Sequence, residues 1–130
     1  MKNFLLRFFT WWNGATVGTL WFTRRVGQFV GEDEFGNRYY RAVVAPLGER
    51  RWVIYAGVAE ASRIPTGWHG WMHHTVDVPP SQEQYVAREW QRPHRPNMTG
   101  TAEAYRPPGS ILTDGRSRAK GDYEAWSPGG

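Results

Sequence analysis

The chain has 130 residues, no cysteine and a formal net charge of +4 at pH 7. The lack of cysteine excludes a disulfide framework, a thiolate metal site and an iron–sulfur cluster held by this chain. The local net charge is +4 over residues 1–25, −1 over residues 26–92 and +1 over residues 93–130. A nucleic-acid-binding domain usually carries a basic face on its folded unit, so this distribution argues against a nucleic-acid partner.

No run of apolar residues reaches membrane-spanning length, and no small-residue cleavage site follows the N-terminal apolar stretch. We therefore expect neither an integral membrane protein nor a secreted one.

Residues 3–13 have the clearest helical pattern. At 100° per residue, their apolar side chains except Leu6 form one arc opposite Lys2, Arg7 and uncharged polar residues. Such a helix either belongs to the core or lies on a membrane surface or in a partner's groove. Basic groups without acids favour a bilayer with anionic headgroups. The residues expected on this membrane or partner surface are Phe4, Leu5, Phe8, Phe9 and Trp12.

The helical pattern is lost from Ala15 to Val26. Glycine and threonine residues there indicate a connector, within which residues 19–23 could form a strand or a short contact segment.

A β-hairpin follows the connector. Two β-favouring runs, Gln28–Val30 and Arg38–Val43, flank the acidic and glycine-containing stretch Gly31–Asn37. We expect Gly36 and Asn37 to supply the positive φ angles of the reversal. The acidic residues resemble a calcium-binding loop only superficially, because spaced oxygen ligands are missing, and a solvated turn is the simpler interpretation.

A third strand and a covering helix complete the expected compact unit. Arg51–Tyr55 is predicted to be the strand, after a turn at residues 46–48. Pro65 can open a helix, which two later prolines limit to a few residues. The apolar residues of that helix, at positions i, i+3 and i+4, are Trp68, Trp71 and Met72. A helix this short is unstable alone, so it should cover one face of the sheet.

His69 and His73 have the spacing of a two-histidine metal site. Gly70, however, stands where a zinc metalloprotease has its catalytic glutamate, and only His74 or Asp77 could add a third ligand. We interpret the pair as interface or capping residues. No nucleophile elbow or phosphate loop is present, so we do not expect an enzyme.

The C-terminal part lacks the composition of a core. Residues 82–91 could hold one helical turn or a short strand, and from residue 93 onward proline, glycine and polar residues separate isolated aromatics. We expect residues 93–112 to lie extended along another protein. The predicted fold class is α+β, with a small antiparallel sheet of about three strands, a short covering helix, an N-terminal amphipathic helix and a long extended C-terminal tail. The predicted parts are residues 1–25 (helix and connector), 26–92 (compact unit) and 93–130 (tail).

Aromatic residues make up 15% of the chain, more than a compact unit of this size can bury. The excess is expected to cover an interface with a larger partner.

Five blocks, in order, resemble a known family. They are residues 31–40 (GEDEFGNRYY), 51–55 (RWVIY), 64–73 (IPTGWHGWMH), 77–80 (DVPP) and 96–107 (PNMTGT followed by AYRP). In this order and spacing they are similar to the small accessory subunit family of respiratory NADH:ubiquinone oxidoreductase (complex I), which also contains the assembly factor mimitin.

The resemblance implies a structural role without a cofactor. It implies other complex I subunits as partners, especially the ferredoxin-like iron–sulfur subunit of the peripheral arm, near the junction with the membrane. It also implies a peripheral location on the inner membrane, on the cytoplasmic side in bacteria or the matrix side in mitochondria. The compact form suits an α-proteobacterial member. The expected partner-interface residues are Tyr39, Tyr40, Trp52, Trp68, His69, Trp71, Trp90, Asn97, Thr99 and Tyr105.

Two other hypotheses remain open. A free-standing module could bind RNA or an acidic protein through Tyr39, Tyr40, Trp52 and Arg51 on an open sheet face. Less favoured is a metal-dependent enzyme built on His69 and His73.

Overall fold

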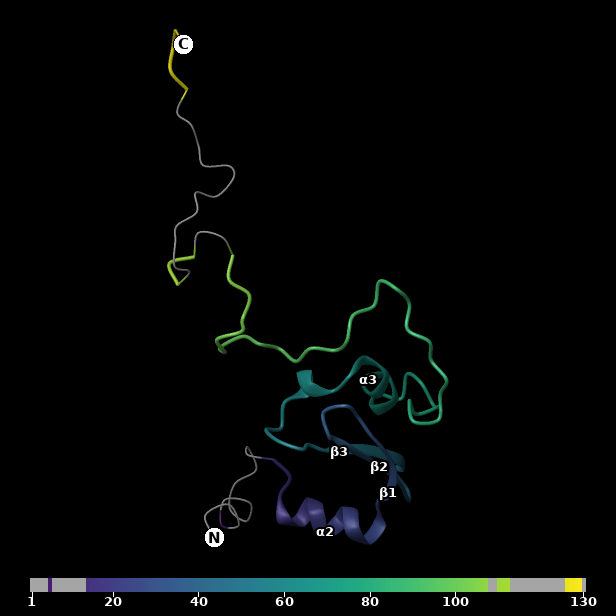
Figure 1. Ribbon diagram of the computed structural model, residues 1–130. Coiled ribbons are helices and arrows are strands. Elements are labelled where there is room, and N and C mark those ends of the chain that lie inside the picture. The colour runs from purple at the N-terminus through teal and green to yellow at the C-terminus, as the bar shows by residue number, and fades with distance from the viewer. Residues whose placement is uncertain (1–4, 6–13, 108–109, 113–125, 130) are drawn as a thin grey trace. The chain divides into compact units, whose positions relative to one another are not determined.

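A computed structural model of the chain describes residue 5 and residues 14–107, 110–112 and 126–129 (Figure 1). It divides the chain into two units, residues 1–97 and residues 98–130. The amphipathic helix expected over residues 3–13 lies outside the described residues, apart from Leu5, which is helical and exposed.

The first unit is built on a three-stranded antiparallel sheet in the order β1-β2-β3. The strands are β1 (Gln28–Glu32), β2 (Arg38–Val44) and β3 (Gly48–Ile54). The predicted hairpin, third strand and α+β class are confirmed, although β3 begins three residues before Arg51.

The β1–β2 turn is organised by Asp33. Its Oδ1 accepts the N–H groups of Phe35 and Asn37 at 2.9 and 3.0 Å, and its Oδ2 accepts the hydroxyl of Tyr39 at 2.7 Å. Glu32 and Glu34 are exposed, as a solvated turn requires. Asp33 is half-buried, and its carboxylate has the additional role of holding both the turn and the first core residue of β2.

Asn37 has a role that the sequence pattern concealed. Gly36 has the expected positive φ of 81°, whereas Asn37 does not. Its buried side chain instead donates from Nδ2 to Asp33 at 2.9 Å and accepts the N–H of Ala56 at 3.1 Å through Oδ1. Asn37 therefore joins the turn to the chain that follows β3.

One face of the sheet is covered by α3 (Thr66–Met72), as predicted. Trp68 stacks on Tyr39 of β2 with ring centroids 3.9 Å apart and planes 3° apart, and Trp71 meets both rings edge-on. A Cβ at Gly31 of β1 would lie 2.8 Å from the Trp68 ring, so this close packing requires glycine there. The core around these rings also includes Ile64, with Val30, Val53, Tyr55 and Met72 at its edge.

Arg51 of β3 fastens the end of α3 to the sheet. Its Nη1 donates to the carbonyls of Trp71 and Val76 at 2.7 and 3.0 Å, and its guanidinium carbon lies 4.9 Å from the Trp71 ring centroid. Ion pairs with Glu49 and Asp77 complete the contacts of a side chain that is only 4% exposed. A cation at a helix C-terminus is favourable because the last carbonyls carry partial negative charge.

The predicted connector over residues 15–26 is wrong, because the chain forms α2 (Val17–Val26) there. Thr16 caps the helix by accepting the N–H of Thr19. Thr23 accepts the indole N–H of Trp52 at 2.8 Å, and the Phe22 and Trp52 rings lie 5.6 Å apart. These contacts with β3 override the weak helix propensity of the glycine and threonine residues.

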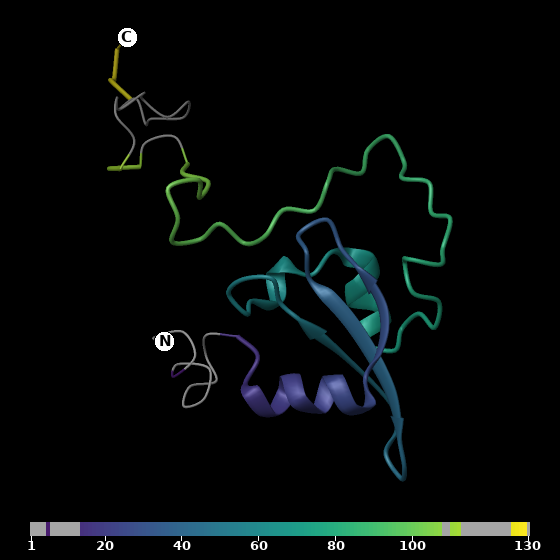
Figure 2. The ribbon, with the colours of Figure 1, turned by 60° about the horizontal axis from the view of Figure 1, so that its bottom comes forward.

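The first unit thus has a helix on each side of its sheet (Figures 1 and 2). Along β2, Tyr39 points to α3, whereas Tyr40 lies beside Trp52 on the α2 side, with ring centroids 6.2 Å apart. Successive residues of β2 therefore pack on opposite faces of the sheet, one toward α3 and the next toward α2.

Residues 82–91 form turns and irregular backbone, so the helical turn or strand predicted there is wrong. In the part of the chain that the structure describes, no helix has the length and apolar character to span a bilayer.

Replacing Trp71 by alanine should lower the free energy of unfolding by about 3–5 kcal/mol, because the loss of a fully buried indole leaves a cavity. Urea unfolding followed by near-ultraviolet circular dichroism measures the change. Trp90→Ala is the matched control, since that indole is 73% exposed and its loss should cost little. Equal destabilisation by the two changes would contradict the assignment of the core.

Stability should fall as the pH rises above about 10. Burial, the hydrogen bond to Asp33 and the charge of that carboxylate raise the pKa of Tyr39 well above its ordinary value of 10.0. Burial also raises the pKa of Tyr55. Both phenols ionise more readily in the unfolded chain, so their contribution is complete below pH 10 and is lost above it.

Tyr39→Phe should therefore reduce the slope of stability against pH between pH 10 and 11 by up to about 1.4 kcal/mol per unit. Urea midpoints measured across this range test the effect, with Tyr105→Phe, an exposed tyrosine, as the control. An unchanged slope in Tyr39→Phe would show that the phenol does not titrate differently on unfolding.

Candidate interaction surfaces

The histidine pair is close but does not form a metal centre of three or more ligands. The rings of His69, on α3, and of His73, directly after α3, lie 4.2 Å apart, and both side chains are exposed. Across the described residues, no group of three or more histidine or carboxylate side chains could hold a metal ion. Neither His74 nor Asp77 completes the set that the metal-enzyme hypothesis needs.

Three of the expected interface residues belong to the core. Tyr39 and Trp71 are fully buried within the chain, and Trp68 is 5% exposed, so of the three rings only Trp68 reaches the surface. Sequence reasoning found the aromatic helix and its place over the sheet, but it also counted these three rings as partner-interface residues. Stacking inside a small core uses the same residue types as docking, and spacing alone does not separate the two.

The other expected residues lie in different surroundings. Tyr40 and Trp52 are half-buried on the α2 side of the sheet. The residues with exposed side chains are His69, Trp90, Asn97, Thr99 and Tyr105. Because α3 covers one sheet face and α2 packs on the Trp52 side of the other, Tyr39, Tyr40 and Trp52 do not form the open platform that the RNA-binding hypothesis needs.

Residues 82–93 form a loop anchored at both ends, which we term the bridging loop. Before it, Ser81 donates its hydroxyl to the carbonyl of Val30 at 3.0 Å. After it, His94 Nε2 lies 2.7 Å from the carbonyl of Ser62, and the N–H of Asn97 donates to the Ser62 hydroxyl at 3.1 Å. The His94 ring also meets Phe35 edge-on.

Inside the bridging loop, Gln91 sets the local conformation. Its Oε1 accepts the hydroxyl of Tyr85 at 2.6 Å and the N–H of Arg88 at 2.8 Å. Tyr85, Val86 and Trp90 are 62%, 85% and 73% exposed. The loop therefore exposes apolar side chains on a backbone that internal hydrogen bonds hold in place. Such preorganisation lowers the conformational entropy that the loop would lose on binding a partner. Of these three, only Trp90 was predicted as an interface residue.

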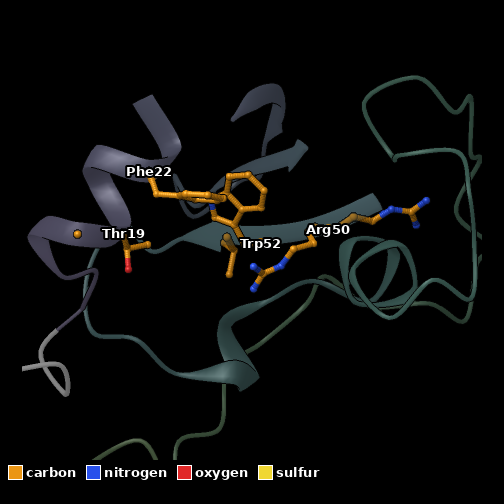
Figure 3. Close-up of a pocket in the computed structure, with 7 residues that line it drawn as sticks. Thr19, Phe22, Arg50 and Trp52 are labelled. Atoms are coloured by element: carbon orange, nitrogen blue, oxygen red, sulfur yellow. The ribbon is translucent and has the colours of Figure 1, made fainter. Parts of the chain in front are cut away.

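A hollow of about 360 Å³ lies between α2 and β3 (Figure 3). Phe22 and Trp52 form its aromatic wall, and Thr19 and Arg50 supply polar groups. The residues that line it are Gly18, Thr19, Phe22, Arg50, Arg51, Trp52 and Val53. A second hollow of about 320 Å³ lies beside the acidic turn and is lined by Trp68, Pro65 and Pro80 among others.

The outer side of α2 was not recognised in the sequence, because no helix was expected there. Trp21 is 62% exposed, and the guanidinium of Arg25 lies 5.5 Å from its ring centroid. Arg24 is exposed as well. The spacing of Phe22 and Val26, four residues apart, was the sequence signal that could have predicted a helix here.

The second unit contributes further exposed apolar residues. Tyr105, Ile111 and Leu112 are exposed, and Arg106 donates to the carbonyl of Leu112 at 3.3 Å. Its described residues contain neither helix nor strand. An extended segment of this kind can contribute to binding only by docking on another surface.

These features define a small α+β protein whose aromatic residues serve both an internal core and exposed surfaces suited to protein contacts. The chain belongs to the NADH ubiquinone oxidoreductase subunit NDUFA12 family, whose family model matches residues 27–128. The resemblance stated from the sequence blocks is thereby confirmed.

Individual relatives support the same assignment. A Dictyostelium discoideum protein named NADH dehydrogenase [ubiquinone] 1 alpha subcomplex subunit 12 is 36% identical over 107 residues, covering 79% of this chain and 78% of the relative. An uncharacterized Rickettsia prowazekii protein is 44% identical over 66 residues, covering 48% of this chain and 64% of the relative. The human NADH dehydrogenase [ubiquinone] 1 alpha subcomplex assembly factor 2 is 32% identical over 93 residues, covering 62% of this chain and 55% of the relative. The match to a bacterial protein is consistent with the expected α-proteobacterial source.

His94→Ala should release the end of the bridging loop and leave the core nearly unchanged, because it removes one hydrogen bond and one ring contact outside the core. Limited trypsin digestion should then cut after Arg88 several times faster than in the unaltered chain. His69→Ala, at another exposed histidine, should leave the rate unchanged. Equal cleavage rates in all three proteins would show that His94 does not hold the loop.

Proposed function

We propose that this chain is a non-catalytic accessory subunit of respiratory complex I, which stabilises or assembles the peripheral arm near its junction with the membrane. The observation that carries the proposal is the family match over residues 27–128. The names of the relatives, which include both a subunit of NADH dehydrogenase and an assembly factor, support the same role. A peripheral position on the inner membrane, on the cytoplasmic side in a bacterium, follows from this role.

The distribution of aromatic residues supports a role in assembly. A unit of this size is only marginally stable alone, yet Trp21, Tyr85, Trp90 and Tyr105 are all exposed. Interfaces are enriched in tryptophan and tyrosine, and such residues dominate binding energies. The exposed aromatics are the surface that a larger host would cover.

The neighbour that we propose is the ferredoxin-like iron–sulfur subunit of the peripheral arm, which supplies electrons to the quinone site. The proposed contact residues are Trp90 in the bridging loop, Asn97 shortly after it, and Thr99 and Tyr105 in the second unit. The N-terminal segment, residues 3–13, is the proposed membrane contact. The chain itself would carry no cofactor in this role.

Deleting the gene should reduce the amount of intact complex I and destabilise its peripheral arm. Native gels of detergent-solubilised membranes, stained for NADH-oxidising activity, measure this directly. Reintroducing the unaltered chain should restore the complex. Normal assembly, stability and activity without the chain would contradict the proposed function.

In the deletion strain, a chain with Tyr85→Ala and Trp90→Ala should be incorporated into the complex at a level tenfold or more below that of the unaltered chain. Truncating aromatic residues at the centre of an interface costs several kcal/mol of binding free energy. His69→Ala with His73→Ala is the matched pair on exposed residues of the same unit and should have a smaller effect. Trp68 and Trp71 are unsuitable for this comparison, since their loss would unfold the core. A greater loss from the histidine pair would instead place the interface at α3.

A further inference from the structure

We propose that the outer face of α2 is a contact surface for an anionic phospholipid bilayer, with Trp21 in the interfacial layer and Arg24 and Arg25 on the lipid phosphates. The inference rests on the proposed peripheral position at the membrane. It assigns a lipid class and particular residues to that contact.

The geometry of α2 separates its two sides. Phe22 and Thr23 point to the sheet, where they contact Trp52. With 100° between successive residues, Trp21 and Arg24 lie on the opposite side and Arg25 at its flank. These three side chains are all exposed.

Among the residues that the structure describes, no acidic group neutralises the charge of the outer side. Within the described residues, no carboxylate forms an ion pair with Arg24 or Arg25. The guanidinium of Arg25 is 5.5 Å from the Trp21 ring centroid. An indole beside unpaired guanidinium groups matches the boundary of a bilayer, where tryptophan concentrates and phosphates attract cations.

The sequence before and through α2 favours a lipid surface over a protein surface. The first acidic residue of the chain is Glu32, and the 31 residues before it contain Lys2, Arg7, Arg24 and Arg25. The amphipathic pattern of residues 3–13 precedes α2 with only a short link between them. Two successive stretches with aromatic and basic residues but no acidic ones favour an anionic bilayer surface. Such a surface attracts basic groups wherever they lie on it, whereas a protein partner would need carboxylates placed opposite each arginine.

Both exposed side-chain types contribute to the expected affinity. Each arginine near an anionic membrane surface strengthens binding by about fivefold, and this electrostatic part weakens as salt rises. The indole of Trp21 adds a contribution that does not depend on lipid charge. The two substitutions therefore have distinguishable consequences.

The test uses the full chain with vesicles of phosphatidylcholine alone or mixed with phosphatidylglycerol, and sedimentation measures binding. The unaltered chain should bind the anionic vesicles much more tightly than the neutral ones. Arg24→Gln with Arg25→Gln should weaken binding to anionic vesicles roughly ten- to thirtyfold. Trp21→Ala should weaken binding to both vesicle types.

Matched controls come from the same folded unit. Arg41→Gln removes an exposed arginine from the α3 side of the sheet, and Trp90→Ala removes an exposed indole from the bridging loop. Neither change should alter vesicle binding. Near-ultraviolet circular dichroism should confirm that all variants keep the native core.

Two results would overturn the proposal. One is unchanged vesicle binding by the Arg24 and Arg25 double variant. The other is failure of the unaltered chain to bind anionic vesicles while Trp21→Ala lowers incorporation into complex I, which would assign α2 to a protein contact. If vesicle binding follows the prediction but the chain is absent from complex I on native gels, the lipid contact stands and the proposed function fails.

Discussion

The stacking of Trp68 on Tyr39 is the contact on which the first unit depends. It joins α3 to the sheet, and Trp71 closes the cluster edge-on. Asp33 holds the Tyr39 hydroxyl from the β1–β2 turn, and Arg51 holds the end of α3 from β3. The turn, the sheet and the helix are therefore connected through one small group of aromatic rings and two charged side chains.

The sequence predicted those elements whose signals are local. The β1–β2 hairpin was found from its turn residues, and α3 from the spacing of Trp68 and Trp71. The helix α2 was missed because glycine and threonine weaken its local propensity, while its main stabilising contact, with Trp52, comes from residues about 30 positions away. Propensity within a window contains no information about such a partner.

The candidate surfaces were predicted less completely, for a related reason. Composition showed that the chain has more aromatic residues than its core can bury, but it does not show which of them the fold leaves exposed. Tyr39, Trp68 and Trp71 lie in the core, whereas Trp21, Tyr85 and Trp90 are exposed. Inside the bridging loop, Tyr85 and Arg88 both donate hydrogen bonds to the side chain of Gln91, a contact that has no recognisable sequence pattern.

Purification of the respiratory complex shows whether this chain is a component of complex I. The NADH-oxidising complex can be isolated from the native membrane through a tag on a core subunit, and its proteins quantified by mass spectrometry. We expect this chain to be recovered with the complex in a fixed ratio, either to the mature enzyme or to an assembly intermediate. Its absence from both, in cells that express it, would rule out a role in complex I.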